Sequence, residues 1–414
     1  MVGIEKDWRE KEASLKEVIK KYSDVSSFVI IKADVQRRGV IYTKRALDKV
    51  DTSKHQVVYR GFATEKDDNT TPMSLLLRDG TSILSGPLIG KRDPYTVDVV
   101  DGKIVLVDDG EVIEEVEYWE KPDYYDKLTS SGKPMWQIVA ARPQRLDINP
   151  NQYCHFWDKP GHGCKFCAIQ ATYSKNKNNK PKRLDINDIA ETVKEALKEK
   201  GRYTSIFLTG GSILSGNELL DDEVDLYISI LKEIGKNFKV DKFPSQLIGT
   251  AFNEKQIKRL YDNTGLTSYT ADIEVLDENI FNWVCPGKAE MIGYKEWKER
   301  LYKAVEIFGV GNVNTGIVSG IELAKPYGYK SEEEALEAML KEAEDLAKHG
   351  VSVVSCVWNV IPGSIFFDQK SPSLEYYIKL SVGLDKLRRK YGLNIDMDNY
   401  RRCGNHPDTD LSRI

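Results

Sequence analysis

The sequence predicts an α/β protein with a β-rich α+β domain at its N-terminal end. From Pro134 to Gly392, short runs of β-branched and other apolar residues alternate six times with amphipathic stretches of helical period. Before residue 130 the apolar runs are separated by turn sequences instead of long helices. Six successive βα units form a barrel or a doubly wound sheet, and functional groups then collect at the carboxyl ends of the strands.

Composition excludes several classes of protein. The 414 residues include 60 Lys and Arg against 64 Asp and Glu, a net charge of −4, so we expect no nucleic-acid partner. We find neither a secretory segment at the N-terminus nor an apolar run of about 18 residues, so we expect no membrane association and a cytoplasmic location. Six cysteines in a chain of this length are too few for a disulfide scaffold.

The N-terminal domain is predicted to span residues 1–130. We expect a helix over residues 5–22, followed by strands at 27–35, 55–62, 82–89, 95–100, 103–109 and 111–119. Asp101-Gly102 and Asp109-Gly110 are typical of the tight turns of β-hairpins. This domain contains no recognisable catalytic motif.

The second domain is predicted to span residues 131–392. Its six strands are expected at 137–148, 205–211, 245–252, 268–275, 312–322 and 351–363. The helices between and after them are expected at 186–200, 223–234, 253–265, 295–308, 331–350 and 373–392. Asn187 is a candidate N-cap of the first of these helices, and Gly265 is a candidate C′ glycine of the third.

Three cysteines occupy the loop after the first predicted strand, at Cys154, Cys164 and Cys167, with the spacing C-x9-C-x2-C. Thiolates in such a loop bind soft metal ions. In one interpretation, His155 or His162 completes a Cys3His zinc site, and the protein is a zinc-stabilised, non-catalytic binding or regulatory protein. In the other, the cysteines hold three irons of a 4Fe-4S cluster and leave the fourth iron open. The loop by itself leaves both interpretations possible.

The loop and its place after the first strand of a six-unit βα domain resemble the radical SAM (S-adenosylmethionine) superfamily, in particular members with a biotin-synthase-like core. The usual loop of that family is C-x3-C-x2-C with an aromatic residue before the last cysteine, a place that Phe166 takes in this sequence. The nine-residue first gap departs from the usual spacing. The resemblance covers residues 134–392 and implies a partial (βα)6 TIM-like barrel, a 4Fe-4S cluster on the three cysteines, and SAM as cofactor.

The second strand ends in Thr209, Gly210, Gly211 and Ser212. This sequence resembles the GGE-like turn of the family, whose backbone receives the amino group of SAM, although Ser212 stands where the family has an acidic residue. Glycines suit such a place because a Cβ would obstruct the approach of a ligand to the backbone. Taken alone, two glycines after a strand also fit an ordinary βα turn.

The fourth and fifth strands carry further candidates. Asp272 and Glu274 share one face of the fourth strand. The resemblance implies that they hold the ribose hydroxyls of SAM, while capping of the next helix or pairing with a lysine is an equally good interpretation. Ile317, Gly320 and Glu322 stand where the family's fifth strand packs against adenine.

The remaining features have simpler interpretations. Cys285 and Cys356 lie in apolar surroundings and are predicted to pack in the interior, although Cys285 is also a candidate hydrogen-atom donor or extra cluster ligand. Cys403 lies in a polar tail, residues 393–414, that we expect to close over the mouth of the barrel. The basic run 175–182 is expected to be a solvated linker.

The resemblance also implies an activity. An electron from a ferredoxin- or flavodoxin-like donor cleaves SAM to a 5′-deoxyadenosyl radical, which abstracts hydrogen from an unactivated carbon of a small-molecule or protein substrate. The outcome is either rearrangement, as in cofactor-biosynthesis enzymes, or C-methylation. Cobalamin remains possible, but the sequence contains no D-x-H-x-x-G corrinoid motif. An enzyme of this kind is expected to be oxygen-sensitive and to work under anaerobic conditions.

Overall fold

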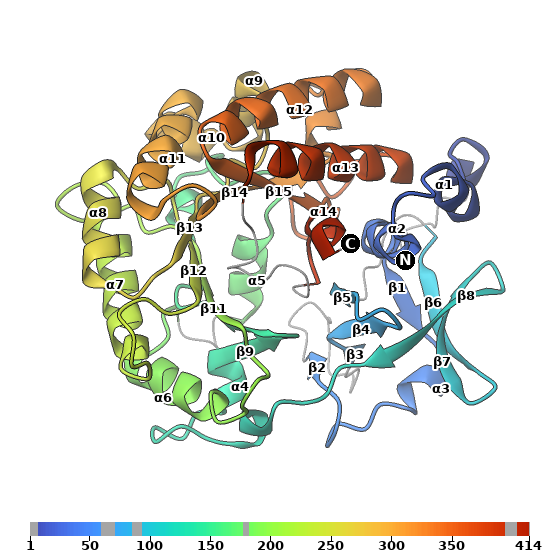
Figure 1. Ribbon diagram of the computed structural model, residues 1–414, viewed down its shortest axis with the longest axis horizontal. Coiled ribbons are helices and arrows are strands. Elements are labelled where there is room, and N and C mark those ends of the chain that lie inside the picture. Colours follow the sequence, from blue (N-terminus) through green and yellow to red (C-terminus); the bar gives the residue numbers. More distant parts are fainter. Residues whose placement is uncertain (1–6, 59–70, 85–92, 177–181, 394–403, 414) are drawn as a thin grey trace.

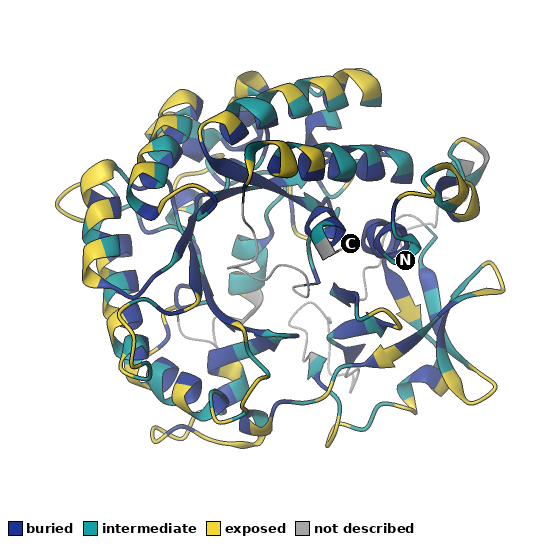
Figure 2. Ribbon diagram, viewed as in Figure 1, coloured by how far each residue is buried: buried dark blue, intermediate teal, exposed yellow. Residues whose placement is uncertain are grey.

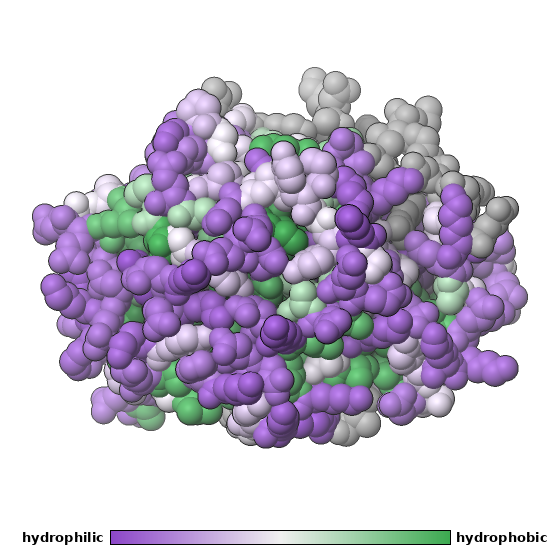
Figure 3. Space-filling view, turned by 90° about the horizontal axis from the view of Figure 1, so that it is seen from above, coloured by the Kyte–Doolittle hydropathy of each residue, from purple (hydrophilic) through white to green (hydrophobic). Residues whose placement is uncertain are grey.

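The computed structural model describes residues 7–58, 71–84, 93–176, 182–393 and 404–413. Figure 1 shows a curved sheet covered by helices on its convex side, and a smaller strand-rich part that lies at the open side of the curve. No helix of the described part is both long and apolar enough to cross a membrane. On the face shown in Figure 3, apolar areas are small and are separated by hydrophilic side chains.

The curved sheet has seven strands in the order β15-β14-β13-β12-β11-β10-β9. They are β9 (Val139–Arg142), β10 (Arg145–Ile148), β11 (Ser205–Thr209), β12 (Ser245–Ile248), β13 (Ser268–Thr270), β14 (Val313–Ser319) and β15 (Val351–Val357). The strands from β10 to β15 are parallel, and β9 pairs antiparallel with β10. The predicted partial (βα)6 barrel is therefore confirmed. The predicted strand at 137–148 is instead one helical turn, α4 (Met135–Ile138), followed by the β9-β10 hairpin.

Six long helices cover the sheet and turn their apolar faces toward it (Figure 2). They are α6 (Ile186–Ala196), α7 (Asp221–Gly235), α8 (Glu254–Asn263), α11 (Tyr294–Phe308), α12 (Glu332–Lys348) and α13 (Leu374–Tyr391). Three shorter helices, α5 (Ile169–Asn176), α9 (Glu278–Val284) and α10 (Pro286–Met291), and the 3₁₀ turns η3 (His155–Trp157) and η4 (Ile321–Leu323) were not predicted. A single apolar core lies between the sheet and these helices.

The predicted N-cap Asn187 was wrong, whereas Gly265 has the predicted C′ position but not the left-handed conformation. Asp185, not Asn187, caps α6, because its carboxylate accepts hydrogen bonds from the backbone N–H groups of the next turn. Helix α8 ends at Thr264, which has extended backbone, and Gly265 is not in the left-handed region. A Cβ at Gly265 would lie 2.3 Å from the ring of Phe243, so this glycine makes room for a side chain.

The N-terminal part contains a six-stranded sheet in the order β1-β6-β7-β8-β4-β5. Its strands are β1 (Val40–Tyr42), β4 (Ser74–Leu77), β5 (Ser82–Leu84), β6 (Tyr95–Val100), β7 (Lys103–Asp108) and β8 (Glu111–Tyr118), and β2 (Val57–Val58) pairs separately with β3 (Thr71–Pro72). Short helical turns, α3 (Lys44–Leu47) and η2 (Asp123–Asp126), lie beside them. The β-rich N-terminal part is confirmed. Both predicted hairpin turns are also confirmed, because their central residues all have positive φ: Asp101, Gly102, Asp109 and Gly110.

The segment predicted as a strand at 27–35 is a helix, α2 (Ser27–Arg38), so that prediction was wrong. Within it, Asp34 pairs with Arg37 and Arg38, which are three and four residues further on and therefore share its helical face. These ion pairs, together with burial of the apolar residues of α2, outweigh the β propensity of the run. The helix predicted at 5–22 is shorter, comprising the 3₁₀ turn η1 (Asp7–Glu10) and α1 (Leu15–Lys21).

The C-terminal helix α14 (Pro407–Asp410), which continues into η7 (Leu411–Arg413), packs against α2, α13 and the edge strand β15. Asp408 Oδ1 accepts a hydrogen bond from the backbone N–H of Ser355 at 3.1 Å, and Arg388 donates to the carbonyl of Val353 at 2.9 Å. These contacts cap the free edge of β15. Residues 394–403 of the predicted tail, including Cys403, and residues 177–181 of the basic run lie outside the described residues.

Candidate functional site

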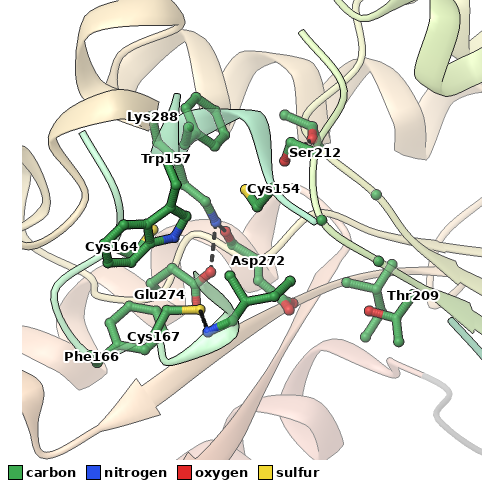
Figure 4. Close-up of a pocket in the computed structure, with 17 residues that line it drawn as sticks. Cys154, Trp157, Cys164, Phe166, Cys167, Thr209, Ser212, Asp272, Glu274 and Lys288 are labelled. Atoms are coloured by element: carbon green, nitrogen blue, oxygen red, sulfur yellow. Dashed lines mark hydrogen bonds and ion pairs between the residues drawn. The ribbon is translucent and has the colours of Figure 1, made fainter. Parts of the chain in front are cut away.

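A pocket lies at the carboxyl ends of the barrel strands (Figure 4). It brings together the cysteine loop, the ends of β11 and β12, the segment after β13, and helix α10. Ten of the predicted site residues line it: Cys154, Cys164, Phe166, Cys167, Thr209, Gly210, Gly211, Ser212, Asp272 and Glu274. Phe156, Trp157, Ile169, Ile248, Gly249, Thr250 and Lys288 complete the lining.

The cysteine loop is held directly against the turn that follows β11. The backbone N–H of His155 donates to the carbonyl of Ser212 at 2.9 Å. A Cβ on Gly211 would lie 2.2 Å from the carbonyl oxygen of Tyr153 and 2.7 Å from Cα of Cys154. The absence of a side chain at Gly211 therefore permits the loop to pass over the turn, and two segments about sixty residues apart in sequence meet at the pocket.

The donor set fits a cluster better than a zinc ion. Among the described residues there is no group of three or more His, Cys, Asp or Glu side chains that could hold one metal ion. Neither His155 nor His162 lines the pocket, and Nε2 of His162 lies 3.3 Å from a carboxylate oxygen of Glu290. Three thiols that border one cavity suit a cluster in which each thiolate binds a different iron.

Burial controls the protonation of the loop thiols. It raises the pKa of Cys154 to about 11 and that of Cys167 to about 12. These two thiols therefore become thiolates only when a bound metal compensates the charge. Cys164 differs, because a hydrogen bond with Cys285 lowers its pKa.

The turn after β11 has support that sequence reasoning missed. The hydroxyl oxygen of Thr250 lies 2.6 Å from Oγ of Ser212 and 2.9 Å from a carboxylate oxygen of Glu223. Glu223 also accepts from the backbone N–H of Thr250 at 2.9 Å and from a second N–H just after the turn at 2.8 Å. Burial raises the pKa of Glu223 to about 7. The carboxylate of Glu223 thus supports Ser212 through Thr250. Glu223 lies eleven residues further along the chain than Ser212.

Asp272 and Glu274 both line the pocket, beside a lysine that sequence reasoning also missed. Nζ of Lys288 lies 2.6 Å from Oε1 of Glu274 and 2.7 Å from the carbonyl oxygen of Asp272. Asp272 accepts from the backbone N–H of Gly316 at 2.8 Å. Burial raises the pKa of Asp272 and raises that of Glu274 to about 7, although the Lys288 ammonium opposes both shifts. Glu274 has a φ of 72°, a strained conformation for a residue with a Cβ.

The three candidates from the fifth strand do not line the pocket. Ile317 is buried in the core and forms a backbone bridge to Glu274. Gly320 has a φ of 109° and packs against Pro372. Glu322 is buried and accepts hydrogen bonds from the N–H of Gly320 and from the hydroxyl of a tyrosine on α13. These residues form the wall behind the pocket.

Cys285 and Cys356 also lie outside the pocket lining. Cys285, between α9 and α10, is fully buried, whereas Cys356, on β15, is partly buried. Sequence reasoning gave Cys285 only as an alternative cluster ligand and did not link Lys288 to the cysteine loop, because helix α10, which carries Lys288, was not predicted.

Comparison with known proteins identifies relatives of this chain. The family model of the Radical SAM superfamily matches residues 156–323, a region that starts just after Cys154 and includes Cys164 and Cys167. The chain is 23% identical over 341 residues to bacteriochlorophyllide c C-7(1)-hydroxylase of Chlorobaculum limnaeum, and the match covers 79% of this chain and 80% of that protein.

Two solved structures are similar to this one. Methylornithine synthase (PylB) matches with a TM-score of 0.40 and 16% identity, over 63% of this chain and 73% of that chain. A radical SAM methyltransferase from Sphaerobacter thermophilus matches with a TM-score of 0.41 and 15% identity, over 77% of this chain and 82% of that chain.

Proposed function

The chain belongs to the radical SAM superfamily, and from this premise we propose that Cys154, Cys164 and Cys167 bind a 4Fe-4S cluster that takes SAM at its open iron. Such a cluster, when reduced by a ferredoxin- or flavodoxin-like protein, supplies the electron that cleaves SAM to methionine and a 5′-deoxyadenosyl radical. One observation carries the proposal: the three thiols of one loop share a pocket with the glycine turn and with the carboxylates of Asp272 and Glu274.

The residues around the cysteines have distinct proposed roles. The backbone of Gly210 and Gly211 receives the amino group of SAM, since both glycines border the pocket. Ser212 is held by Thr250 through its hydroxyl and by His155 through its carbonyl, and it fixes the position of the two glycines. Asp272 and Glu274, which both follow β13, hold the ribose hydroxyls. The aromatic rings of the loop that line the pocket exclude water from a radical reaction: Phe156, Trp157 and Phe166.

The reaction on the substrate begins with hydrogen abstraction from an unactivated carbon. Similarity to a protein named bacteriochlorophyllide c C-7(1)-hydroxylase supports a reaction at a carbon atom of the substrate. Rearrangement and C-methylation are the two outcomes that we propose for the resulting substrate radical, with cobalamin as a further cofactor only in the second case. The substrate is a small molecule or a protein. The oxygen sensitivity of such a cluster places the reaction in an anaerobic cytoplasm.

Anaerobic reconstitution tests the proposal. The protein should turn brown, with an absorbance shoulder near ~400 nm from thiolate-bound iron, and should release 5′-deoxyadenosine from SAM after reduction. Single substitution of alanine for Cys154, Cys164 or Cys167 should lower the iron content and abolish 5′-deoxyadenosine release. The matched control is Cys356→Ala, which lies outside the pocket and should leave both unchanged. Colourless protein with one zinc ion per chain would contradict the proposal.

A further inference from the structure

An apolar patch, formed by Trp283, Tyr327, Ile365 and Phe366, lies at the surface beside the cysteine loop. The rings of Tyr327 and Trp283 pack with their centres 5.1 Å apart, and those of Trp283 and Phe366 pack at the same distance. Tyr327 is 69% exposed and Ile365 is 54% exposed, whereas Phe366 is buried. Large apolar side chains that are exposed together are typical of a surface that contacts another protein.

Hydrogen bonds hold the parts of the apolar patch together. The backbone N–H of Lys325 donates to the side-chain oxygen of Gln369 at 2.8 Å, and the side-chain amide of Gln369 donates to the carbonyl of Lys325 at 3.2 Å. This reciprocal pair fixes the segment that carries Tyr327 against the segment that carries Phe366.

The apolar patch is also bonded to the cysteine loop. The backbone N–H of Phe366 donates to the carbonyl of Lys165 at 3.0 Å, and the N–H of Lys165 donates to the carbonyl of Val284 at 2.9 Å. Lys165 follows Cys164 directly and precedes Cys167 by two residues. An electron that enters through the apolar patch therefore has a short path to two of the three proposed cluster ligands.

The surroundings of the apolar patch are positively charged. Within four residues of the patch along the chain, where every residue is described, there are three exposed lysines and one acidic residue: Lys325, Lys330, Lys370 and Asp368. Lys165, whose backbone is bonded to the patch, adds a fourth lysine. An apolar centre with charges of one sign around it favours a partner whose docking face is apolar at its centre and negatively charged around it.

We propose that the apolar patch and its lysines are the docking surface of an acidic, flavodoxin-like protein that reduces the cluster. The inference rests on the function proposed above. A flavodoxin presents the apolar edge of its flavin ring among carboxylates, so it complements this surface both in polarity and in charge. In each encounter the reduced flavin loses one electron, and the oxidised cluster gains it.

Binding tests the surface without turnover. Isothermal titration calorimetry of the reconstituted protein with oxidised flavodoxin gives the Kd. It should rise about 10-fold in the double variant Lys325→Glu/Lys370→Glu. Tyr327→Ala should also weaken binding, because it removes the exposed ring of the patch. Added salt should weaken binding of the wild type more than that of the double variant.

The matched control is Lys232→Glu/Lys236→Glu. It reverses two exposed charges on α7, which lies far from α9 (Figure 1), and should bind flavodoxin as the wild type does. An equal Kd in the wild type and in Lys325→Glu/Lys370→Glu would overturn the proposed surface. An equal loss of binding in the control would show that only the net charge of the protein matters, which overturns the surface too.

Release of 5′-deoxyadenosine separates this inference from the function on which it rests. Dithionite is a small reductant that needs no docking surface, so it should drive release equally in the wild type and in Lys325→Glu/Lys370→Glu. With reduced flavodoxin well below its KM, release should fall about 10-fold in this variant. No release by the wild type with dithionite would contradict the proposed function, whereas the binding experiment would still test the surface.

Two further results overturn the docking proposal. Loss of dithionite-driven release in Lys325→Glu/Lys370→Glu would place these lysines in the active site instead of a docking surface. Faster release with a ferredoxin than with flavodoxin at equal concentration would show that the surface fits the other class of carrier.

Discussion

Lys288 and Glu274 form a short ion pair inside the pocket, with 2.6 Å between Nζ and Oε1 (Figure 4). The two side chains are only 11% and 14% exposed. They come from different elements: Glu274 follows β13, and Lys288 lies on α10. The pair therefore links the segment after β13 to the short helix α10, and it sets the charge balance beside the three cysteines that line the pocket.

Removal of the Lys288 ammonium group should lower the stability of the folded protein. Lys288→Met leaves the Glu274 carboxylate buried without its cation, so we expect a loss of about 3–5 kcal/mol in the free energy of unfolding, measured by denaturant titration. In the double variant that combines Lys288→Met with Glu274→Gln, part of the lost free energy of unfolding should be regained. Lys295→Met, which removes an exposed lysine at 3.6 Å from Glu278, is the matched control and should cost less than about 1 kcal/mol. Equal losses in the two lysine variants would contradict this prediction.

The stability of the protein should depend on pH through Glu274. Burial raises its pKa from 4.5 to about 7, so the folded state holds a proton that the unfolded state releases between these values. This contribution to stability is complete below pH 4.5 and is lost as the pH rises through 7. Relative to Glu274→Gln, the wild type should lose about 3 kcal/mol over that range. Unfolding titrations of both proteins from pH 4.5 to 8 measure the difference, and parallel curves would contradict the assigned shift.

A methyl group on Gly211 should displace the cysteine loop. The added Cβ meets backbone atoms of Tyr153 and Cys154, which cannot move aside as a flexible side chain does. We expect Gly211→Ala to fold but to bind much less iron on reconstitution, measured as iron and sulfide per chain. Gly235→Ala is the matched control, since its Cβ would make only an ordinary contact at 3.5 Å. Full iron content in Gly211→Ala would show that the loop tolerates the displacement.

The buried pair of Lys32 and Asp410 should stabilise the whole molecule. Both side chains are 0% exposed, and Nζ and Oδ2 are 2.7 Å apart. Lys32→Met should lower the free energy of unfolding by about 3–5 kcal/mol and should make the C-terminal residues accessible to carboxypeptidase. Lys21→Met removes a lysine that is 59% exposed and should cost under about 1 kcal/mol. An unchanged rate of C-terminal cleavage in Lys32→Met would contradict the role given to the pair.

Much of the fold was predictable because its elements have a clear period. The six βα units, the hairpins at Asp101-Gly102 and Asp109-Gly110, and the loop with the three cysteines all follow from local patterns. Helix α2 was not predictable in this way. Its run of β-branched residues is typical of a strand, and its helical form depends on burial against segments that are distant in sequence.

The site was predictable only in part, because some of its residues lie on segments that carry no local pattern. The glycines after β11 and the two acidic residues after β13 follow strand ends, and the structure brings them to one pocket. Thr250 and Lys288 reach the same pocket from the segment after β12 and from α10, and Glu223 on α7 supports Thr250. These segments carry no motif, so only the tertiary arrangement reveals the three residues. Conversely, Gly320 packs against Pro372 and does not border the pocket, because a strand motif does not determine which segments a residue contacts in the fold.

The contact between Lys32 and Asp410 joins residues that are 378 positions apart. During synthesis, helix α2 emerges early, and its lysine has no counter-charge from α14 until residue 410 has been made. The backbone N–H of Ser355, on the edge strand β15, likewise acquires its acceptor only after Asp408 has been made. The barrel and the N-terminal sheet can therefore form in sequence order, whereas their joining is completed by α13 and α14, which are made last. Assembly of the protein is therefore completed late in the synthesis of each chain. A chain that terminates before α14 should leave the N-terminal sheet and the barrel incompletely joined.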